Sequence, residues 1–197
     1  DPPEIEKAND EGLGQRKTFE GPVSFDPETH RPRNPRGRTG LSGRGRLGRW
    51  GANLAVDPIV TRLHPRTNQL QVVVVRRRDT NEWSLPGKFL ADNETVPLGL
   101  RNAFEPKAAN FQGQGAEENR MQNLLDDLFV SEITDRTVYK GYVDDPRNTD
   151  NAWIETTAVH YHCSRELSAK IRLQAKSVDE RKELLKRTGS FLGRLFE

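Results

Sequence analysis

Hydrophobic and polar positions predict strands in four main stretches of the chain. Residues 57–64 (DPIVTRLH) and 69–78 (QLQVVVVRRR) indicate two strands joined by a short turn. The unbroken β-branched run from Val72 to Val75 is typical of a strand buried on both faces. Residues 137–145 and 152–163 alternate between apolar and polar side chains, so they predict two further strands with a polar loop between them.

Helical spacing occurs in three other stretches. We expect a helix over 97–104, and Pro106 should oppose its continuation because proline lacks an N–H and clashes with the preceding turn. Residues 115–130 and 177–197 predict two more helices, the last one bent near Gly189. The apolar side of the helix over 115–130 consists of Met121, Leu124, Leu125 and Leu128.

Composition limits the size and class of the protein. With 197 residues, 33% hydrophobic and 30% charged, the chain suits one domain with a small lobe, and part of it should be loop or tail. We expect a tail or connector over 1–18, an N-terminal lobe over 19–56 and a core domain over 57–197. No apolar run approaches the roughly 20 residues of a membrane-spanning helix, and no stretch resembles a signal peptide. The single cysteine, Cys163, suits a reducing compartment.

The N-terminal lobe is rich in glycine, proline and arginine. Seven arginines lie between Arg31 and Arg49. They allow three interpretations: a nucleic-acid-binding segment, an ordered coil with buried ion pairs, or a surface that faces an anionic ligand. Only Trp50 provides an aromatic ring for stacking bases there, so nucleic acid is the least favoured of the three.

Residues 85–108 (LPGKFLADNETVPLGLRNAFEPKA) begin like a loop–helix motif that hydrolyses nucleoside diphosphate compounds. Such a motif needs clustered carboxylates, because a hard cation must neutralise two phosphates and activate water. The pattern is Gly, five residues, Glu, seven residues, then Arg-Glu-x-x-Glu-Glu. Gly87 and Glu94 fit its opening when the five residues are counted from position 88, where Lys88 replaces a second glycine.

The helix of this motif has lost most of its carboxylates. Asn102 stands in place of the arginine, and Glu105 is displaced by one position, about 100° around a helix. A lysine at a metal-binding position repels the cation. The degraded motif thus has Glu94, Ala103, Glu105, Pro106 and Lys107 at or beside its carboxylate positions, and none of them is assigned as a catalytic residue. We therefore predict no metal site, although Glu94, Glu105, Asp92 or the pair Asp144 and Asp145 could rebuild one.

The loop over 144–150 carries the densest group of polar side chains. Carboxylates of Asp144, Asp145 and Asp150 can accept hydrogen bonds from ribose hydroxyls, and Arg147 can donate a two-pronged hydrogen bond to a phosphate. The alternative is a turn that is held by its own ion pairs.

Several separated segments resemble the ADP-ribose pyrophosphatase branch of the Nudix superfamily. They are similar in particular to the C-terminal Nudix-homology domain of ADP-ribose-gated melastatin-type TRP cation channels. The segments that carry the resemblance, within about residues 18 to 165, are NPRGRTGLSGRG, GAN, DPIVTR, EWSLPG and DDPRNTDNAWIET. The resemblance implies a small lobe followed by a Nudix α/β/α sandwich around a mixed sheet, with ADP-ribose in a cleft between lobe and core.

The resemblance also implies ligand-binding residues. Asp145 and Arg147 match contacts to the ribose and phosphate side, and Gly87 and Phe89 match the loop that flanks the diphosphate. The full set of expected ligand residues is Asp145, Arg147, Gly87, Phe89, Arg77, Asn53 and Asp150. Beside Asn53, Leu54 replaces a histidine of the relatives. At the C-terminus, LLKRT occupies the place of the family's Tyr-Ala-Asn/Ser-His segment, so the resemblance implies no ligand contact from Leu184 or Arg187.

Two functions follow as expectations from the resemblance. The first is an ADP-ribose sensor with little or no hydrolysis, on the cytoplasmic side of a membrane. Its partners would be other domains and neighbouring subunits of a homotetrameric Ca²⁺-permeable channel, with no nucleic acid, and it would meet the membrane only through the rest of a longer chain. The alternative is an active Mg²⁺-dependent pyrophosphatase that gives AMP and ribose 5-phosphate, or a variant of one inactivated by alanine at position 103.

The remaining conspicuous side chains have structural interpretations. His160 and His162 alternate on a predicted strand next to Cys163, but a zinc site would need more ligands at suitable spacing. Trp83 and Trp153 are expected in the core, and one of them is a candidate for lining the cleft.

Overall fold

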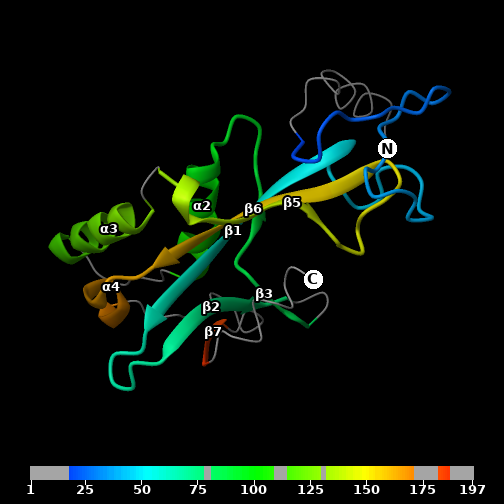
Figure 1. Cartoon of the computed structure of the whole chain (residues 1–197). Helices are drawn as coiled ribbons and strands as arrows, with labels where there is room; N and C mark the ends of the chain where they lie inside the picture. The colour runs from blue at the N-terminus through cyan, green and yellow to red at the C-terminus, as the bar shows by residue number, and fades with distance from the viewer. Residues whose placement is uncertain (1–17, 78–80, 109–114, 130–131, 171–181, 187–197) are drawn as a thin grey trace. The chain divides into compact units, whose positions relative to one another are not determined.

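The computed structural model describes residues 18–77, 81–108, 115–129, 132–170 and 182–186 (Figure 1), and for 105–108 and 182–186 it describes the backbone alone. In chain order, the elements are β1 (Gly51–Leu63), β2 (Leu70–Arg76), β3 (Trp83–Ser84), β4 (Lys88–Phe89), α2 (Val96–Ala108), α3 (Ala116–Leu128), the 3-10 helix η2 (Thr134–Arg136), β5 (Thr137–Val143), β6 (Ala152–His162), α4 (Arg165–Lys170) and β7 (Lys182–Lys186).

The described strands form a mixed sheet with the order β3-β2-β1-β6-β5, in which β4 also pairs with β1 and β7 with β2. Strand β2 runs antiparallel to β1 and to β3. Strands β1 and β6 run parallel, because Gly51 N–H donates to Asn151 near one end and Cys163 N–H donates to Thr61 near the other. This mixture of directions, with helices alongside, confirms the predicted α/β fold.

All four predicted strand regions contain strands. In β2, Val72, Val73 and Val74 are buried, as expected for a strand covered on both faces. Strand β1 starts earlier than predicted, at Gly51. Its added N-terminal part, GANLAV, lacks the β-branched density that made the later part recognisable.

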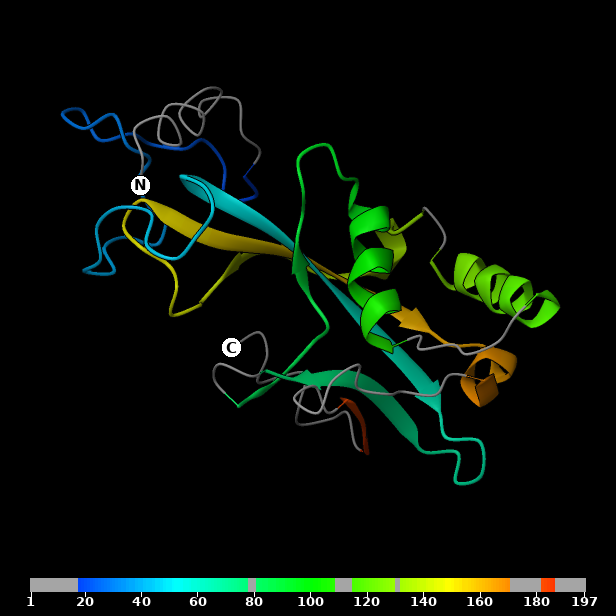
Figure 2. The ribbon, with the colours of Figure 1, turned by 180° about the vertical axis from the view of Figure 1, so that it is seen from behind.

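Two helix predictions need correction. Helix α2 continues through Pro106 to Ala108, because a proline in the last turn leaves only one carbonyl, that of Asn102, without its helical donor. The predicted C-terminal helix is wrong over Lys182–Lys186, which forms strand β7 paired antiparallel with β2 (Figure 2). The hydrogen bonds between β2 and β7 outweigh the local helical preference of these residues. The rest of 177–197 lies outside the described residues. The short helix α4 was not predicted.

The chain divides into two compact units, one of residues 1–55 and 139–157 and one of residues 56–138 and 158–197. The unit that contains the lobe is thus completed by most of β5 and the first part of β6. The division into 1–18, 19–56 and 57–197 stays a prediction. Within the described residues, no helix has the length and apolar character that a membrane crossing requires.

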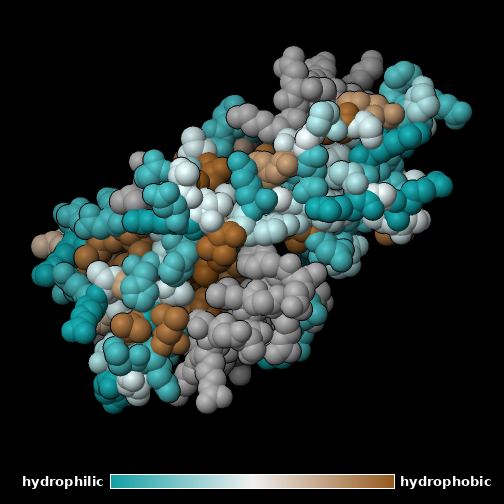
Figure 3. All heavy atoms as spheres, viewed as in Figure 1, coloured by the Kyte–Doolittle hydropathy of each residue, from teal (hydrophilic) through white to brown (hydrophobic). Residues whose placement is uncertain are grey.

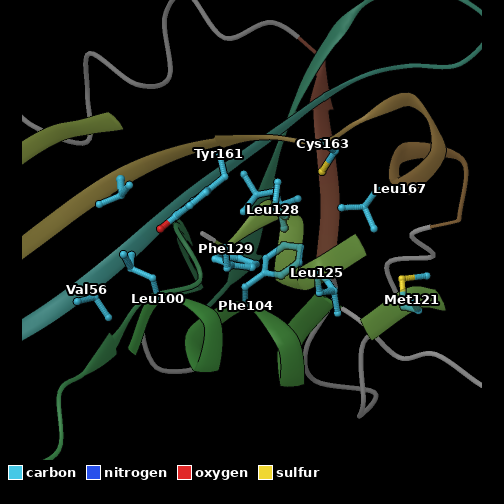
Figure 4. Close-up of a cluster of buried hydrophobic side chains, with 13 residues drawn as sticks. Val56, Leu100, Phe104, Met121, Leu125, Leu128, Phe129, Tyr161, Cys163 and Leu167 are labelled. Carbon is cyan, nitrogen blue, oxygen red and sulfur yellow. The ribbon is translucent and has the colours of Figure 1, made fainter. Parts of the chain in front are cut away.

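The core of the second unit is built by α2, α3 and the strands beside them (Figure 4). Leu100 and Phe104 come from α2, and Tyr161 comes from β6. The ring centroid of Phe129 lies 5.4 Å from that of Phe104 and 4.6 Å from that of Tyr161. The predicted apolar side of α3 is confirmed, since Met121, Leu125 and Leu128 are buried and Leu124 packs against them.

Two tryptophans were expected in the core. Trp153 is buried in the first unit and donates its indole N–H to Glu155 over 2.7 Å. Trp83 is only half-buried, and the Arg76 guanidinium carbon lies 5.9 Å from its ring centroid. The core expectation is therefore confirmed for Trp153, and it fails for Trp83 because β3 is a two-residue strand at one end of the strand order.

Candidate functional site

The loop between β5 and β6 presents one arginine in a fixed orientation. Arg147 donates from Nε to Oδ1 of Asp145 and from Nη2 to Oδ2, both over 2.7 Å. The Arg147 backbone N–H adds a bond to Asp145 Oδ1 over 2.9 Å. The arginine side chain is 27% exposed and the aspartate side chain 11%. A guanidinium that is oriented in this way can meet an anion without first losing rotational freedom.

Amide side chains tie the two ends of this loop together. Asn148 donates to the Val143 carbonyl over 2.7 Å and to the Tyr142 hydroxyl over 3.0 Å, while its Oδ1 accepts from Ile154 N–H over 3.0 Å. Asn34, from the lobe, donates to the Tyr142 hydroxyl over 3.2 Å and to the Thr149 carbonyl over 2.9 Å. These buried bonds fix the conformation that carries Arg147. Sequence reasoning missed them, since an isolated asparagine in a coil has no distinctive spacing.

Asp150 engages the lobe rather than its own loop. Its Oδ1 accepts from Thr39 N–H over 2.6 Å, from the Thr39 hydroxyl over 3.0 Å and from Gly40 N–H over 3.2 Å. These hydrogen bonds, that from the Thr39 backbone first, hold the pKa of Asp150 below its ordinary value. One oxygen of this expected ligand residue therefore shapes the turn at 39–40.

Asn53, near the start of β1, also forms hydrogen bonds with the protein backbone. Its side-chain amide donates to the carbonyls of Arg49, Gly51 and Trp153, and its Oδ1 accepts from Arg49 N–H. The residue is only 5% exposed. Its expected contact with a ligand stays a prediction, and the described bonds show that it orders the backbone between lobe and strand.

Several arginines of the lobe have partners within the first unit. Arg33 pairs with Asp26 over 2.8 Å, Arg36 with Glu20 over 3.0 Å, and the Arg31 guanidinium lies 4.5 Å from the centroid of the Trp50 ring. This arrangement matches the predicted ordered coil, except that Arg33 and Arg36 are exposed rather than buried. The visible face of this part of the chain, at the upper right of Figure 3, is mostly hydrophilic.

In the second unit, the Leu-Pro-Gly turn makes a close approach to β1. A Cβ atom at Gly87 would lie 2.0 Å from Asp57 Oδ1, so only glycine fits without a shift. Phe89, two residues later, is 42% exposed. Arg77, at the end of β2, donates its backbone N–H to Glu82 over 2.8 Å. Three of the expected ligand residues thus belong to this unit, and Asp145, Arg147, Asn53 and Asp150 belong to the other.

The Mg²⁺ ion implied by the family resemblance does not fit the described side chains of the degraded motif. Both oxygens of Glu94 accept hydrogen bonds from Lys88, over 2.7 and 2.6 Å. Ala103 offers no ligand atom and is fully buried. Across the part of the chain that the structure describes, no three His, Cys, Asp or Glu side chains lie close enough to hold an ion. The side chains of Glu105, Pro106 and Lys107 lie outside the described atoms.

The histidine pair on β6 shares one hydroxyl group. Thr61 Oγ1 lies 2.8 Å from His160 Nε2 and 2.9 Å from His162 Nδ1. Partial burial, and then the charges of His162 and Arg136, lower the pKa of His160. Cys163 is buried, which raises its pKa to about 11 and keeps the thiol protonated.

Comparison with known proteins places these features in context. Residues 5–51 match the family described as NUDT9-like, N-terminal domain. The chain is 45% identical over 165 residues to a mitochondrial ADP-ribose pyrophosphatase of Rattus norvegicus, covering 77% of this chain and 46% of the relative. It is 46% identical over 167 residues to the putative nudix hydrolase 6 of Caenorhabditis elegans, covering 84% and 59%. The chain thus spans about half the length of these two relatives.

A channel protein is also similar. A transient receptor potential cation channel subfamily M member-like 2 of Nematostella vectensis is 41% identical over 155 residues, which is 73% of this chain and 10% of the channel.

Proposed function

Because the chain belongs to the NUDT9-like branch of the Nudix family, we propose that it binds ADP-ribose and leaves the ligand intact. The observation that carries the proposal is the contrast between two loops. The loop over 144–150 keeps an oriented arginine, while the described side chains of the degraded motif include the carboxylate of Glu94, whose hydrogen-bonding capacity is already used.

Binding is supported by the chemistry of the Asp145–Arg147 pair. A phosphate of ADP-ribose matches the planar donor edge of the Arg147 guanidinium, and ribose hydroxyls match carboxylate acceptors. Asp145 also orders Arg147, so the two residues act as one unit. The mitochondrial relative is an ADP-ribose pyrophosphatase, which supports this ligand over other nucleotides.

Loss of hydrolysis is supported by the missing metal ligands. Activating a water molecule and neutralising two phosphates require a cation held by several carboxylates. In the described part of the motif, position 103 is an alanine inside the core and Glu94 is bound to a lysine.

A regulatory role in a larger assembly is the finer part of the proposal. The similarity to a cation channel, of which the matched region is 10%, supports a cytoplasmic ligand-sensing domain that contacts other domains and neighbouring subunits. Binding would then act by favouring one conformation of the assembly, in proportion to the difference in affinity between its states.

One observation favours the alternative, an active pyrophosphatase that uses Mg²⁺ and releases AMP and ribose 5-phosphate. Identity to the rat enzyme, at 45%, exceeds that to the channel reported above, at 41%. On this alternative, the metal would need carboxylates such as that of Glu105, whose side chain lies outside the described atoms.

Calorimetric titration with ADP-ribose tests the proposal. We expect the wild type to bind in the presence of EDTA, and Arg147→Ala or Asp145→Ala to weaken binding at least about tenfold, since a charged hydrogen bond contributes about 1.5–3 kcal/mol. Arg46→Ala, which removes an exposed arginine of the lobe, is the matched control and should bind as the wild type does. Unchanged affinity in both loop variants would remove this loop from the binding site.

A further inference from the structure

The carboxylate of Glu94 is saturated with hydrogen bonds. Its Oε1 accepts from Lys88 Nζ over 2.7 Å and from Asn102 Nδ2 over 2.9 Å. Its Oε2 accepts from Lys88 Nζ over 2.6 Å and from Ala91 N–H over 2.9 Å. A carboxylate offers about four acceptor positions, and here the protein itself occupies all of them.

These bonds join three segments of the second unit. Lys88 belongs to β4, Ala91 to the turn that follows it, and Asn102 to the middle of α2. The Glu94 side chain is 8% exposed and that of Lys88 29%. The positive charge that balances the buried carboxylate therefore comes from the loop, whereas the helix contributes only a neutral amide.

We propose that Lys88 acts as a built-in cation for Glu94, fastening the loop over 88–94 to α2 without a metal and excluding divalent cations from this carboxylate. Two physical reasons support the exclusion. A cation would have to displace a half-buried ammonium group at hydrogen-bonding distance, and it would find no lone pair of Glu94 unused. The same contacts, the Ala91 backbone bond first, hold the pKa of Glu94 at about 2, so the carboxylate stays ionised at neutral pH.

The pairing of Lys88 with Glu94 also bears on how ADP-ribose binding responds to metal, and this consequence rests on the proposed function. Gly87 and Phe89 are expected to flank the diphosphate; Phe89 belongs to the loop over 88–94, and Gly87 directly precedes it. ADP-ribose affinity should then be the same in EDTA and in excess Mg²⁺. The tests below contain no ADP-ribose, so they can fail or succeed independently of the proposed function.

Thermal unfolding in EDTA tests whether the contact of Lys88 with Glu94 stabilises the fold. Lys88→Met keeps most of the aliphatic stem but strands a buried carboxylate, so the midpoint should fall by at least about 5 °C. Adding Asn102→Arg to Lys88→Met should restore most of that loss, because position 102 already reaches Glu94 from an exposed site. The matched control is Lys170→Met, which removes an exposed pair with Glu166 and should shift the midpoint by no more than about 1 °C. An unchanged midpoint in Lys88→Met, or no rescue by the second substitution, would contradict the stabilising role of the Lys88–Glu94 pair.

Mn²⁺ titration of the wild type, followed by electron paramagnetic resonance, tests the exclusion. We expect the Glu94 carboxylate to bind no Mn²⁺, so the wild type and Glu94→Gln should give the same titration curve. Uptake by the wild type that Glu94→Gln abolishes would overturn the exclusion. If Lys88→Met does not fold, Lys88→Arg must still fold with a midpoint near that of the wild type, and its failure would contradict the role of charge.

Discussion

At the scale of single residues, hydrogen-bonding partners decide what a side chain can offer a ligand. Sequence reasoning identified Asp145 and Arg147, and the structure shows that they hold each other. It also identified Asn53 and Asp150, whose partners are backbone groups of the lobe and neighbouring strands. Residue type could be predicted from the motifs. The hydrogen-bonding partner could not be predicted, because it can lie far away in the sequence. Thr39, which donates to Asp150, is more than 90 positions away from it.

Arg147→Lys separates charge from geometry in the candidate site. Lysine keeps the positive charge but cannot donate two parallel hydrogen bonds to Asp145 or to a phosphate. We expect ADP-ribose binding to weaken about tenfold, which corresponds to about 1.4 kcal/mol, while the urea midpoint changes little. Calorimetry and urea unfolding of the same preparation provide the two readings. Wild-type affinity in Arg147→Lys would mean that charge alone suffices.

The lowered pKa of His160 gives a pH-dependent prediction. The folded-state pKa of His160 lies below its ordinary value of 6.5, so the unfolded chain binds more protons as the pH falls through that value. The free energy of unfolding should therefore fall between pH 7 and the lowered pKa, and His160→Gln should lose less over the same window. Urea unfolding at several pH values measures the difference. Parallel curves for the two proteins would contradict the lowered pKa.

At the scale of elements, the loop over 144–150 depends on the N-terminal lobe. The Tyr142 hydroxyl accepts from Asn34 of the lobe and from Asn148 of the loop. This dependence explains why a coil rich in arginine and glycine orders at all: its polar groups find partners on β5 and on the loop that follows. A local pattern could not reveal it, because neither asparagine carries a motif of its own.

Tyr142→Phe tests this dependence. The substitution leaves two amide donors short of an acceptor, so we expect a loss of about 1–3 kcal/mol in the free energy of unfolding together with weaker ADP-ribose binding. Tyr161→Phe is the matched control, because that hydroxyl is buried and finds no hydrogen-bond partner among the described residues. Its removal should be neutral or stabilising. Equal effects of the two substitutions would contradict the role of the Tyr142 hydroxyl.

Helix α2 places part of the degraded motif in the hydrophobic core. Leu100, Ala103 and Phe104 are buried at helical spacing, so the position where the motif has its first clustered glutamate is fully buried. A glutamate restored there would strand a carboxylate in the core.

We expect Ala103→Glu to cost about 3–5 kcal/mol in the free energy of unfolding, the typical effect of a buried unpaired charge. Leu98→Glu on the same helix is the control, since Leu98 is 49% exposed, and it should cost far less. Urea unfolding checks both values. Wild-type stability of Ala103→Glu, with Mg²⁺-dependent release of AMP, would instead support an enzyme inactivated at this position.

At the scale of the whole molecule, the sequence predicted the mixed α/β sheet and the order of most elements correctly. Alternating and helical periods report burial within one element, and for β2, β6 and α3 that information was sufficient. It failed at β7, where pairing with the distant strand β2 determines the conformation, and at the end of α2, where helical context tolerates Pro106. The family match over residues 5–51 and the relatives agree with the resemblance read from the motifs.

The central claim is that the chain binds ADP-ribose and does not cleave it. The most direct test mixes the protein with ADP-ribose and Mg²⁺, measures the bound fraction by equilibrium dialysis, and then separates the nucleotides of the same sample by chromatography. We predict a saturable bound fraction and full recovery of intact ADP-ribose. AMP in the sample, or no binding at all, would contradict the account.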